Sequence, residues 1–361
     1  MKILFFTHED LEHSAVAKAM FEEIAQSLSD KFDITFISAG KENHQRTEKN
    51  INYIFFKRRG FGKKDVISSG FLSMITSLPL FISELYKCDK VIFRSYPSYI
   101  LMLPFSIAFR KKIIFDTRGL WFHELKENKH INDFVLKLLL PFERILLSVA
   151  SEIITVTNSQ KCFYIKNHKT KRQKITTIPN FSKVLPFKDK TSKNSLSLLY
   201  VGSLLNWHSP NIMLMICEKL QDLNVNFIFN VYTKDVRKAK NLFNNINNCF
   251  IKEHNYRQYP EKHDFAFSII SGGISKEVCF PVKFSEYVNA GCRVISSSNV
   301  SETNELTNRY ALGISHDFEN ESIEKVIEYI LSNKDLEYEP MTNFDFKHQL
   351  QGYKNIIQKN D

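Results

Sequence analysis

The stretch FPVKFSEYVNAGCRVI, residues 280–295, carries helix and strand signals in the order that decides the fold. Pro281 suits the first position of a helix and Gly291 suits the position after a helix end, so PVKFSEYVNA is predicted to form a short helix leading into the strand CRVISS. Lys283 then lies in the first turn, where free backbone N–H groups and the helix dipole favour an anion. Two interpretations are open: Lys283 pairs with Glu286 on the helix surface, or it contacts an anionic ligand.

The composition indicates a globular protein with room for two domains. The chain has 361 residues, of which 43% are hydrophobic and 24% are charged. No apolar run is long enough to cross a bilayer, and MKILFFTHED reads as a first strand and not as a signal peptide, so a cytoplasmic location is expected. The six cysteines are widely spaced, which argues against a disulfide framework or a zinc site.

The net charge of +10 suggests an anionic partner. Its densest basic patch is KRRGFGKK at residues 57–64, followed by an apolar stretch that begins at Phe71. Nucleic acid is not expected as a partner, since no nucleic-acid-binding motif accompanies the patch. An anionic membrane surface is the predicted partner, and a solvated loop is the alternative.

Strand and helix patterns alternate along both halves of the chain, which predicts an α/β fold with parallel sheets. A polar, lysine-rich segment without periodicity separates the halves and reads as a linker. The predicted organisation is an N-terminal domain at 1–182, a linker at 183–196, a C-terminal domain at 197–340, and a C-terminal helix at 341–361 that packs back on the first domain. Two such domains imply a cleft between them, with ligands at the carboxyl ends of the strands.

Several common site motifs are missing from the sequence. The turn after the first strand has no glycine fingerprint for a dinucleotide, and the chain has no HExxH, GxSxG, GxxxxGK or DxD pattern. We therefore expect no cofactor and no metal at the site.

Four segments together resemble the GT-B glycosyltransferases, in particular the retaining glycosyltransferase family 4. They are IIFDTRGLWFHE, SEIITVTNSQKCFYI with KITTIPNFSK, LLYVGSLLNWHSPNIML, and FPVKFSEYVNAGCRVISS, and they follow the family's order from about residue 113 to 306. The resemblance implies two Rossmann-like domains with an inter-domain cleft. The N-terminal domain would hold the acceptor and the C-terminal domain the nucleotide-sugar donor.

The resemblance gives Lys283 its anion. It implies that a nucleotide diphosphate sits at the start of the helix that follows Pro281, against Lys283 and the free amides. Glu286, one turn later, would accept hydrogen bonds from the ribose hydroxyls. The sequence departs from the family pattern just before this helix. Val278 occupies the place of the family's first carboxylate, and Glu277 lies one position away.

The glycine loop after the first strand of the C-terminal domain is the second part of the implied donor site. Gly202 matches the family, but Ser203 stands at the family's arginine position and His208 at its lysine position. We expect His208 to make a weaker, pH-dependent phosphate contact beside Trp207. The alternative is that Trp207 is anchored in the core with a satisfied His208.

The implied acceptor side lies in the N-terminal domain. Asp116 and Arg118 end a predicted strand and are candidates for contacts with an acceptor hydroxyl and a phosphate. An internal ion pair that shapes the turn at Gly119 is the alternative. Glu124 is assigned by the family pattern alone, and Ser14 follows the first strand as an acceptor contact or a helix N-cap.

These observations predict a retaining, hexosyl-type glycosyltransferase. It would move a sugar from a nucleotide-sugar, expected to be a UDP-sugar, to a saccharide or lipid-linked saccharide in surface polysaccharide or glycan synthesis. The protein would be peripheral on the inner face of the cell membrane. Two other functions remain open, a non-catalytic partner of another transferase and a nucleotide-sugar epimerase.

Overall fold

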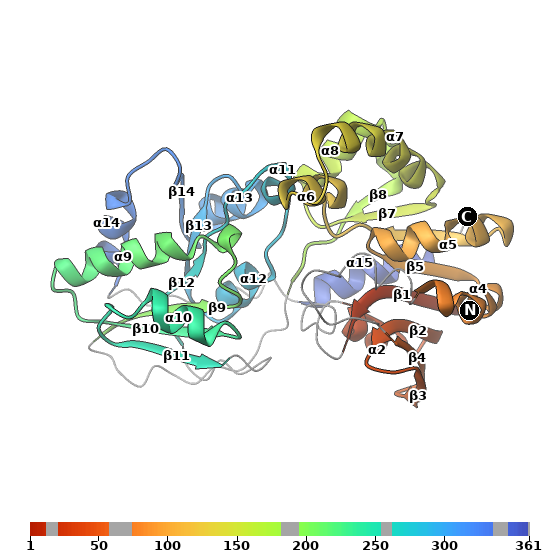
Figure 1. The fold of residues 1–361 in the computed structure, drawn as a ribbon, viewed down its shortest axis with the longest axis horizontal. Coiled ribbons are helices and arrows are strands. Elements are labelled where there is room, and N and C mark those ends of the chain that lie inside the picture. The colour runs from red at the N-terminus through yellow and green to blue at the C-terminus, as the bar shows by residue number, and fades with distance from the viewer. Residues whose placement is uncertain (12–20, 58–73, 182–194, 254–261, 335–345, 360–361) are drawn as a thin grey trace. The chain divides into compact units, whose positions relative to one another are not determined.

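The computed structural model describes residues 1–11, 21–57, 74–181, 195–253, 262–334 and 346–359. The chain divides into two compact units, each built on its own sheet (Figure 1). The N-terminal unit comprises Met1–Pro179 with Gln349–Asp361, and the C-terminal unit comprises Asn180–His348. Ser14, most of the basic patch at 57–64, and the predicted linker up to residue 194 lie outside the described residues.

The described part of the N-terminal unit contains an eight-stranded sheet in the order β3-β4-β2-β1-β5-β6-β7-β8. All pairings are parallel except that of β3 with β4. The strand order reverses between β1 and β5, which is the arrangement of a doubly wound sheet. The strands are β1 Lys2–Asp10, β2 Asp33–Gly40, β3 His44–Glu48, β4 Ile51–Lys57, β5 Lys90–Arg94, β6 Lys112–Asp116, β7 Glu152–Thr155 and β8 Ile175–Thr177.

Helices make the other crossover connections between parallel strands of the N-terminal unit, but β2 reaches its parallel neighbour β4 through the antiparallel edge strand β3. The last helix, α15, returns to this unit after the whole of the C-terminal unit, and Lys90 Nζ donates to the Ile357 carbonyl near its end (2.6 Å). The helices are α2 Glu23–Leu28, α4 Leu78–Lys87, α5 Tyr96–Ala108, α6 Trp121–Glu127, α7 Asp133–Val149, α8 Asn158–His168, the 3-10 turn η2 Arg172–Lys174, and α15 Phe346–Gln358.

The described part of the C-terminal unit contains a six-stranded parallel sheet in the order β11-β10-β9-β12-β13-β14. Numbered within the unit, this is the order 3-2-1-4-5-6 of a Rossmann fold, with its switch point between β9 and β12. The strands are β9 Leu196–Val201, β10 Phe227–Thr233, β11 Cys249–Glu253, β12 Phe265–Ser268, β13 Arg293–Ser297 and β14 Gly313–His316. The helices and the 3-10 turn are η3 Asn206–His208, α9 Pro210–Asp222, α10 Val236–Leu242, α11 Ile274–Glu277, α12 Val282–Asn289, α13 Ser301–Tyr310 and α14 Glu324–Asn333.

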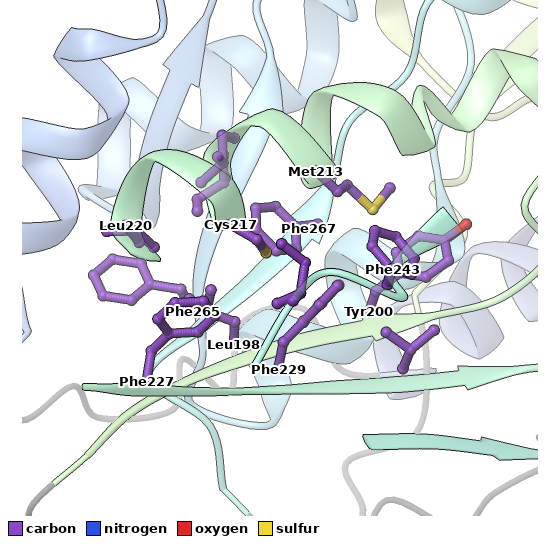
Figure 2. Packing of buried hydrophobic residues seen from close by; sticks show 14 of the residues in the cluster. Leu198, Tyr200, Met213, Cys217, Leu220, Phe227, Phe229, Phe243, Phe265 and Phe267 are labelled. Carbon is purple, nitrogen blue, oxygen red and sulfur yellow. The ribbon is translucent and has the colours of Figure 1, made fainter. Parts of the chain in front are cut away.

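The core of the C-terminal unit lies between α9 and the central strands. Met213, Cys217 and Leu220 recur at helical spacing, so they share the face of α9 that meets the sheet. Figure 2 shows these side chains packed with Phe229 and Phe267 of β10 and β12. Every residue of β9 is buried, which is typical of a central parallel strand. This rigid support ends at Val201, where the polar loop begins.

Among the described helices, none is long and apolar enough to cross a membrane. The described residues also contain no group of three His, Cys, Asp or Glu side chains arranged to hold a metal ion.

Candidate functional site

Lys283 lies in the first turn of α12 and points at the end of β9. Its Nζ is 3.2 Å from Tyr200 Oη and 4.7 Å from the centre of the Tyr200 ring. Both ring nitrogens of His208, in η3, lie within 3.4 Å of the same Nζ. The ammonium is therefore held by an aromatic face, a hydroxyl and an imidazole, all at the switch point of the sheet.

Gly202 is required by this placement of Lys283. Its φ of +135° lies in a region that side chains rarely adopt. A Cβ at Gly202 would lie only 2.5 Å from Lys283 Nζ and 2.6 Å from Cε. The lysine thus occupies the volume that any other residue at position 202 would need.

The loop after Gly202 is fixed by hydrogen bonds to neighbouring elements. Tyr200 Oη donates to the Ser203 carbonyl, and the Leu204 N–H donates to Asp235 Oδ2 (2.8 Å). Because Tyr200 Oη also accepts from Lys283, one hydroxyl holds both the loop and the lysine.

Trp207 is half-buried in the 3-10 turn η3. Lys276 Nζ is 4.8 Å from the centre of its ring, and the Trp207 carbonyl accepts from the Ser271 N–H (3.0 Å). His208 beside it is buried, and Ser209 Oγ bonds Ser271 Oγ (2.9 Å). The loops after β9 and β12 are therefore joined across the switch point. Both interpretations of Trp207 and His208 stay predictions.

Burial sets the charges of this cluster. It lowers the pKa of Lys283 to about 7, although Glu286 acts to raise it. Burial, with the charges of Lys283 and Lys276, lowers the pKa of His208 to about 2. His208 is therefore neutral near pH 7, and its unprotonated nitrogen accepts from Lys283. The predicted phosphate contact of His208 stays a prediction.

The start of α12 differs by one residue from the sequence prediction. Pro281 is the N-cap with an extended ψ of 121°, and Val282 is the first helical residue. The Gly291 N–H donates to the Val288 carbonyl (3.0 Å), and Gly291 has a φ of +71°. Such a cap ends the helix at the predicted glycine. Near the helix end, Tyr287 Oη accepts from the Val201 N–H (2.9 Å), which fixes α12 against β9.

Glu286 is half-buried one turn after Lys283. Glu277 is exposed at the end of α11, and Val278 is buried. The carboxylate of Glu277 is therefore exposed to solvent, and the position that the sequence comparison assigned to a carboxylate, 278, holds a buried valine.

The N-terminal unit carries a second polar cluster at the carboxyl end of β6. Asp116 is buried, and its Oδ2 accepts from Arg118 Nε (2.9 Å) and from Tyr353 Oη (2.6 Å). Arg118 Nη2 donates to Tyr353 Oη (2.7 Å), so the three side chains form a closed ring. The other oxygen of Asp116 has no hydrogen-bond partner among the described residues. The structure thus shows the internal ion pair, and the acceptor roles of both residues stay predictions.

A second ion pair lies at the switch point of the same sheet, at the ends of β1 and β5. Arg94 Nε is 3.1 Å from Glu9 Oε1. Burial acts to raise the pKa of Glu9, but the charges of Arg94 and His8 outweigh it and lower the pKa. Sequence reasoning missed this pair, and also Tyr200 and Tyr353. The sequence signal for the ion pair was a charged residue at the end of each apolar strand, Glu9 in β1 and Arg94 in β5.

Glu124, on α6, is half-buried. The structure brings Gly202, His208 and Lys283 together in the C-terminal unit. It brings Asp116 and Arg118 together in the N-terminal unit.

The chain was compared with protein families, curated proteins and solved structures. No family model matches the chain, and no curated protein matches it. Solved structures do. Sucrose-phosphate synthase from Thermosynechococcus elongatus is similar at a TM-score of 0.75 and 9% identity over 99% of this chain and 98% of that one. Anabaena Alr3699/HepE in complex with UDP-glucose is similar at a TM-score of 0.67 and 11% identity over 99% and 100%. A glycosyltransferase from Rickettsia africae ESF-5 gives 0.65 and 15% over 99% and 99%.

The chain has the GT-B fold. The predicted α/β class with two Rossmann-like domains is confirmed. The cluster around Lys283 lies in the C-terminal Rossmann-like unit of this chain, at the carboxyl ends of its strands.

Proposed function

We propose that the protein is a glycosyltransferase that uses a nucleotide-sugar donor, expected to be a UDP-sugar. The observation that carries the proposal is the position of Lys283, which is held at Gly202 on the switch point of the C-terminal sheet. Ligands of open α/β sheets bind at such points. One of the similar solved structures, Anabaena Alr3699/HepE, is a complex with UDP-glucose.

On the donor side, the diphosphate would lie at the start of α12. The first N–H groups of a helix are unpaired within the helix and attract an anion. Lys283 adds a cation whose contacts in the structure are Tyr200 and His208. As the bond to the sugar breaks, negative charge grows on the departing diphosphate, and a cation already in place stabilises it.

Glu286 is proposed to bind the ribose. A carboxylate accepts two hydrogen bonds at once, which matches the two ribose hydroxyls. Glu286 follows Lys283 by one turn of α12, so phosphate and ribose would be read by the same helix.

The acceptor hydroxyl is proposed to meet the cluster on β6. The buried Asp116 oxygen without a partner is able to accept one hydrogen bond. Arg118 and Tyr353 hold the carboxylate by its other oxygen. We propose retention of the anomeric configuration, with the leaving diphosphate taking the proton of the acceptor and no protein nucleophile.

The finer assignment follows the sequence. We propose a saccharide or lipid-linked saccharide acceptor, a role in surface glycan synthesis, and a peripheral position on the inner face of the cell membrane. The basic residues around Lys57 and the net charge of +10 support an anionic surface as partner.

The test is a panel of nucleotide-sugars with two readouts. A ligand that binds only the folded state raises the melting temperature. At least one UDP-sugar should raise Tm, and Lys283→Met should reduce that rise. The same donor with a saccharide pool should then yield a glycosylated product, with little hydrolysis in its absence. Conversion of the donor to an epimer without acceptor, or no response to any nucleotide-sugar, would contradict the proposal.

A further inference from the structure

Helix α7, Asp133–Val149, is apolar on two sides. One side is buried in the N-terminal unit, with Leu146 and Leu147 fully covered. The other side exposes large side chains: Phe134 is 70% exposed, Leu138 62% and Ile145 55%. Figure 1 shows α7 beside α8, over β7 and β8. An ordinary surface helix has charged residues on its outer face, so this helix has an unexplained apolar face.

The exposed residues form one stripe. At 3.6 residues per turn, Phe134, Leu138 and Ile145 fall within roughly 40° of one another around the helix, and they span about 17 Å along it. The exposed Pro141 lies between them. Lys137 and Arg144, both exposed, run along one edge. We call these six residues the α7 stripe.

The α7 stripe contains cations and no carboxylate. Of the acidic residues of the helix, the exposed Asp133 lies one turn before Lys137 on the same edge, where it is paired with Lys126 (2.6 Å) and also interacts with Lys137. One carboxylate against three cations, Lys126, Lys137 and Arg144, leaves this edge with a net positive charge. Glu143 is buried and faces His168 (3.0 Å) on the inner side. The outward face of α7 is therefore apolar with a positive edge.

We propose that the α7 stripe docks on an anionic membrane surface. The apolar side chains would enter the boundary between headgroups and acyl chains, and Lys137 and Arg144 would contact lipid phosphates. A helix that lies in the interface combines these two features, an apolar face and flanking cations.

The charge pattern favours a bilayer over a second copy of the chain. A two-fold contact through the α7 stripe would bring two net-positive edges together, and Asp133, the carboxylate on each edge, is already paired with Lys126. Anionic lipid supplies the missing charge. The inference rests on the membrane position included in the proposed function, but vesicle binding is measured separately from nucleotide-sugar binding, so the two fail independently.

The first experiment is co-sedimentation of the full chain with vesicles. Phosphatidylglycerol mixed with phosphatidylcholine is compared with phosphatidylcholine alone. The triple variant Phe134→Ser, Leu138→Ser, Ile145→Ser should bind the anionic vesicles at least tenfold more weakly than the parent.

The matched control changes three side chains of similar exposure in the C-terminal unit. Met215, Leu223 and Phe250 are 50%, 49% and 50% exposed. Their replacement by Ser should leave vesicle binding unchanged. Circular dichroism and Tm, together with the Tm rise given by nucleotide-sugar, show that both variants are folded.

The second experiment reports contact directly. In Leu138→Trp, added anionic vesicles should shift the fluorescence to shorter wavelength, and brominated lipid should quench it. In Lys137→Gln with Arg144→Gln, binding to anionic vesicles should fall severalfold, and binding to phosphatidylcholine alone should not change.

Three results would overturn the proposal: no vesicle binding by the parent, equal binding by the folded stripe variant, or a dimer of the parent that the stripe variant loses while vesicle binding persists.

Discussion

Binding of the nucleotide-sugar should take up a proton at Lys283, so the affinity should fall as the pH rises from about pH 6 to about pH 8. The experiment therefore varies the pH and leaves the protein unchanged. A nucleotide-sugar suits the test because each of its two phosphates has a single, strongly acidic group, which stays ionised throughout this range. His208, with a pKa of about 2, stays neutral throughout, and burial raises the pKa of the Tyr200 hydroxyl above its ordinary value.

The magnitude follows from the pKa of Lys283. In the free protein that pKa is about 7, chiefly because of burial. A diphosphate in contact with the ammonium favours the charged form and should raise the pKa by about two units. At about pH 8 the free protein carries roughly a tenth of this proton and the complex about nine tenths or more, so binding takes up about 0.8 to 0.9 of a proton. The affinity should fall about ninefold over the two pH units, or about 1.3 kcal/mol.

The sign follows from linkage. Below about pH 6 both states are protonated, and the affinity is independent of pH. Between about pH 7 and about pH 9 only the complex holds the proton, so each rise in pH within this range weakens binding. A group whose pKa is lowered by binding, such as a carboxylate that gains a cation in the complex, would release a proton and give a rise instead.

Isothermal titration calorimetry in buffers of different ionisation enthalpy measures the proton uptake and the affinity together. Lys283→Met is the control, and its affinity should be weaker and independent of pH. An uptake near zero at about pH 8 in the parent, or the same pH dependence in Lys283→Met, would refute the assignment of Lys283 to the diphosphate.

Four further outcomes are expected. Glu286→Gln should weaken nucleoside diphosphate binding by about 1–3 kcal/mol, the scale of a hydrogen bond to a charged group, and equal affinity by calorimetry would remove the ribose role. Gly202→Ala should abolish the Tm rise with nucleotide-sugar, whereas Gly272→Ala, also at positive φ but against Lys276, should keep it; equal losses would indicate backbone strain alone. Tyr353→Phe should lower kcat and leave donor affinity unchanged, because it opens the ring around Asp116; a change confined to donor affinity would contradict this. Transfer should persist in excess EDTA, because Lys283 and the helix amides supply the positive charge, and complete, magnesium-reversible loss would defeat this expectation.

Most buried strands were predicted from the sequence because their burial shapes their composition, although the buried strand β4, INYIFFK, was missed. KILFF, LSLLYVG and NFIFNVYT correspond to β1, β9 and β10. The edge strands β3 and β11 are largely exposed, so HQRTE and CFIKE carry little apolar alternation and gave no signal. Pro281 was placed one position too far into the helix, since its φ of −66° suits both the N-cap and the first turn.

Site residues were predictable only where their position in a local element is unusual for their residue type. Lys283 stood out because a cation is unfavourable in a first helical turn. Tyr200 and Tyr353 left no such trace, because an aromatic residue in a buried strand or helix suits the core equally well. Their roles depend on partners 83 and 237 positions away in the chain. The charge of His208 was also unpredictable, since burial sets it.

The ring around Asp116 joins residues that a ribosome makes at very different times. Asp116 and Arg118 are made early, but Tyr353 is made only after the whole of Asn180–His348. Until then the emerging N-terminal unit holds its Asp116–Arg118 pair without the hydroxyl that joins the two side chains, and Lys90 without its carbonyl partner on α15. Domains generally fold in the order of their synthesis, but here the first unit is completed last. A chain that ends before residue 346 and has been released from the ribosome should therefore have a folded C-terminal unit and an N-terminal unit that is still open to protease.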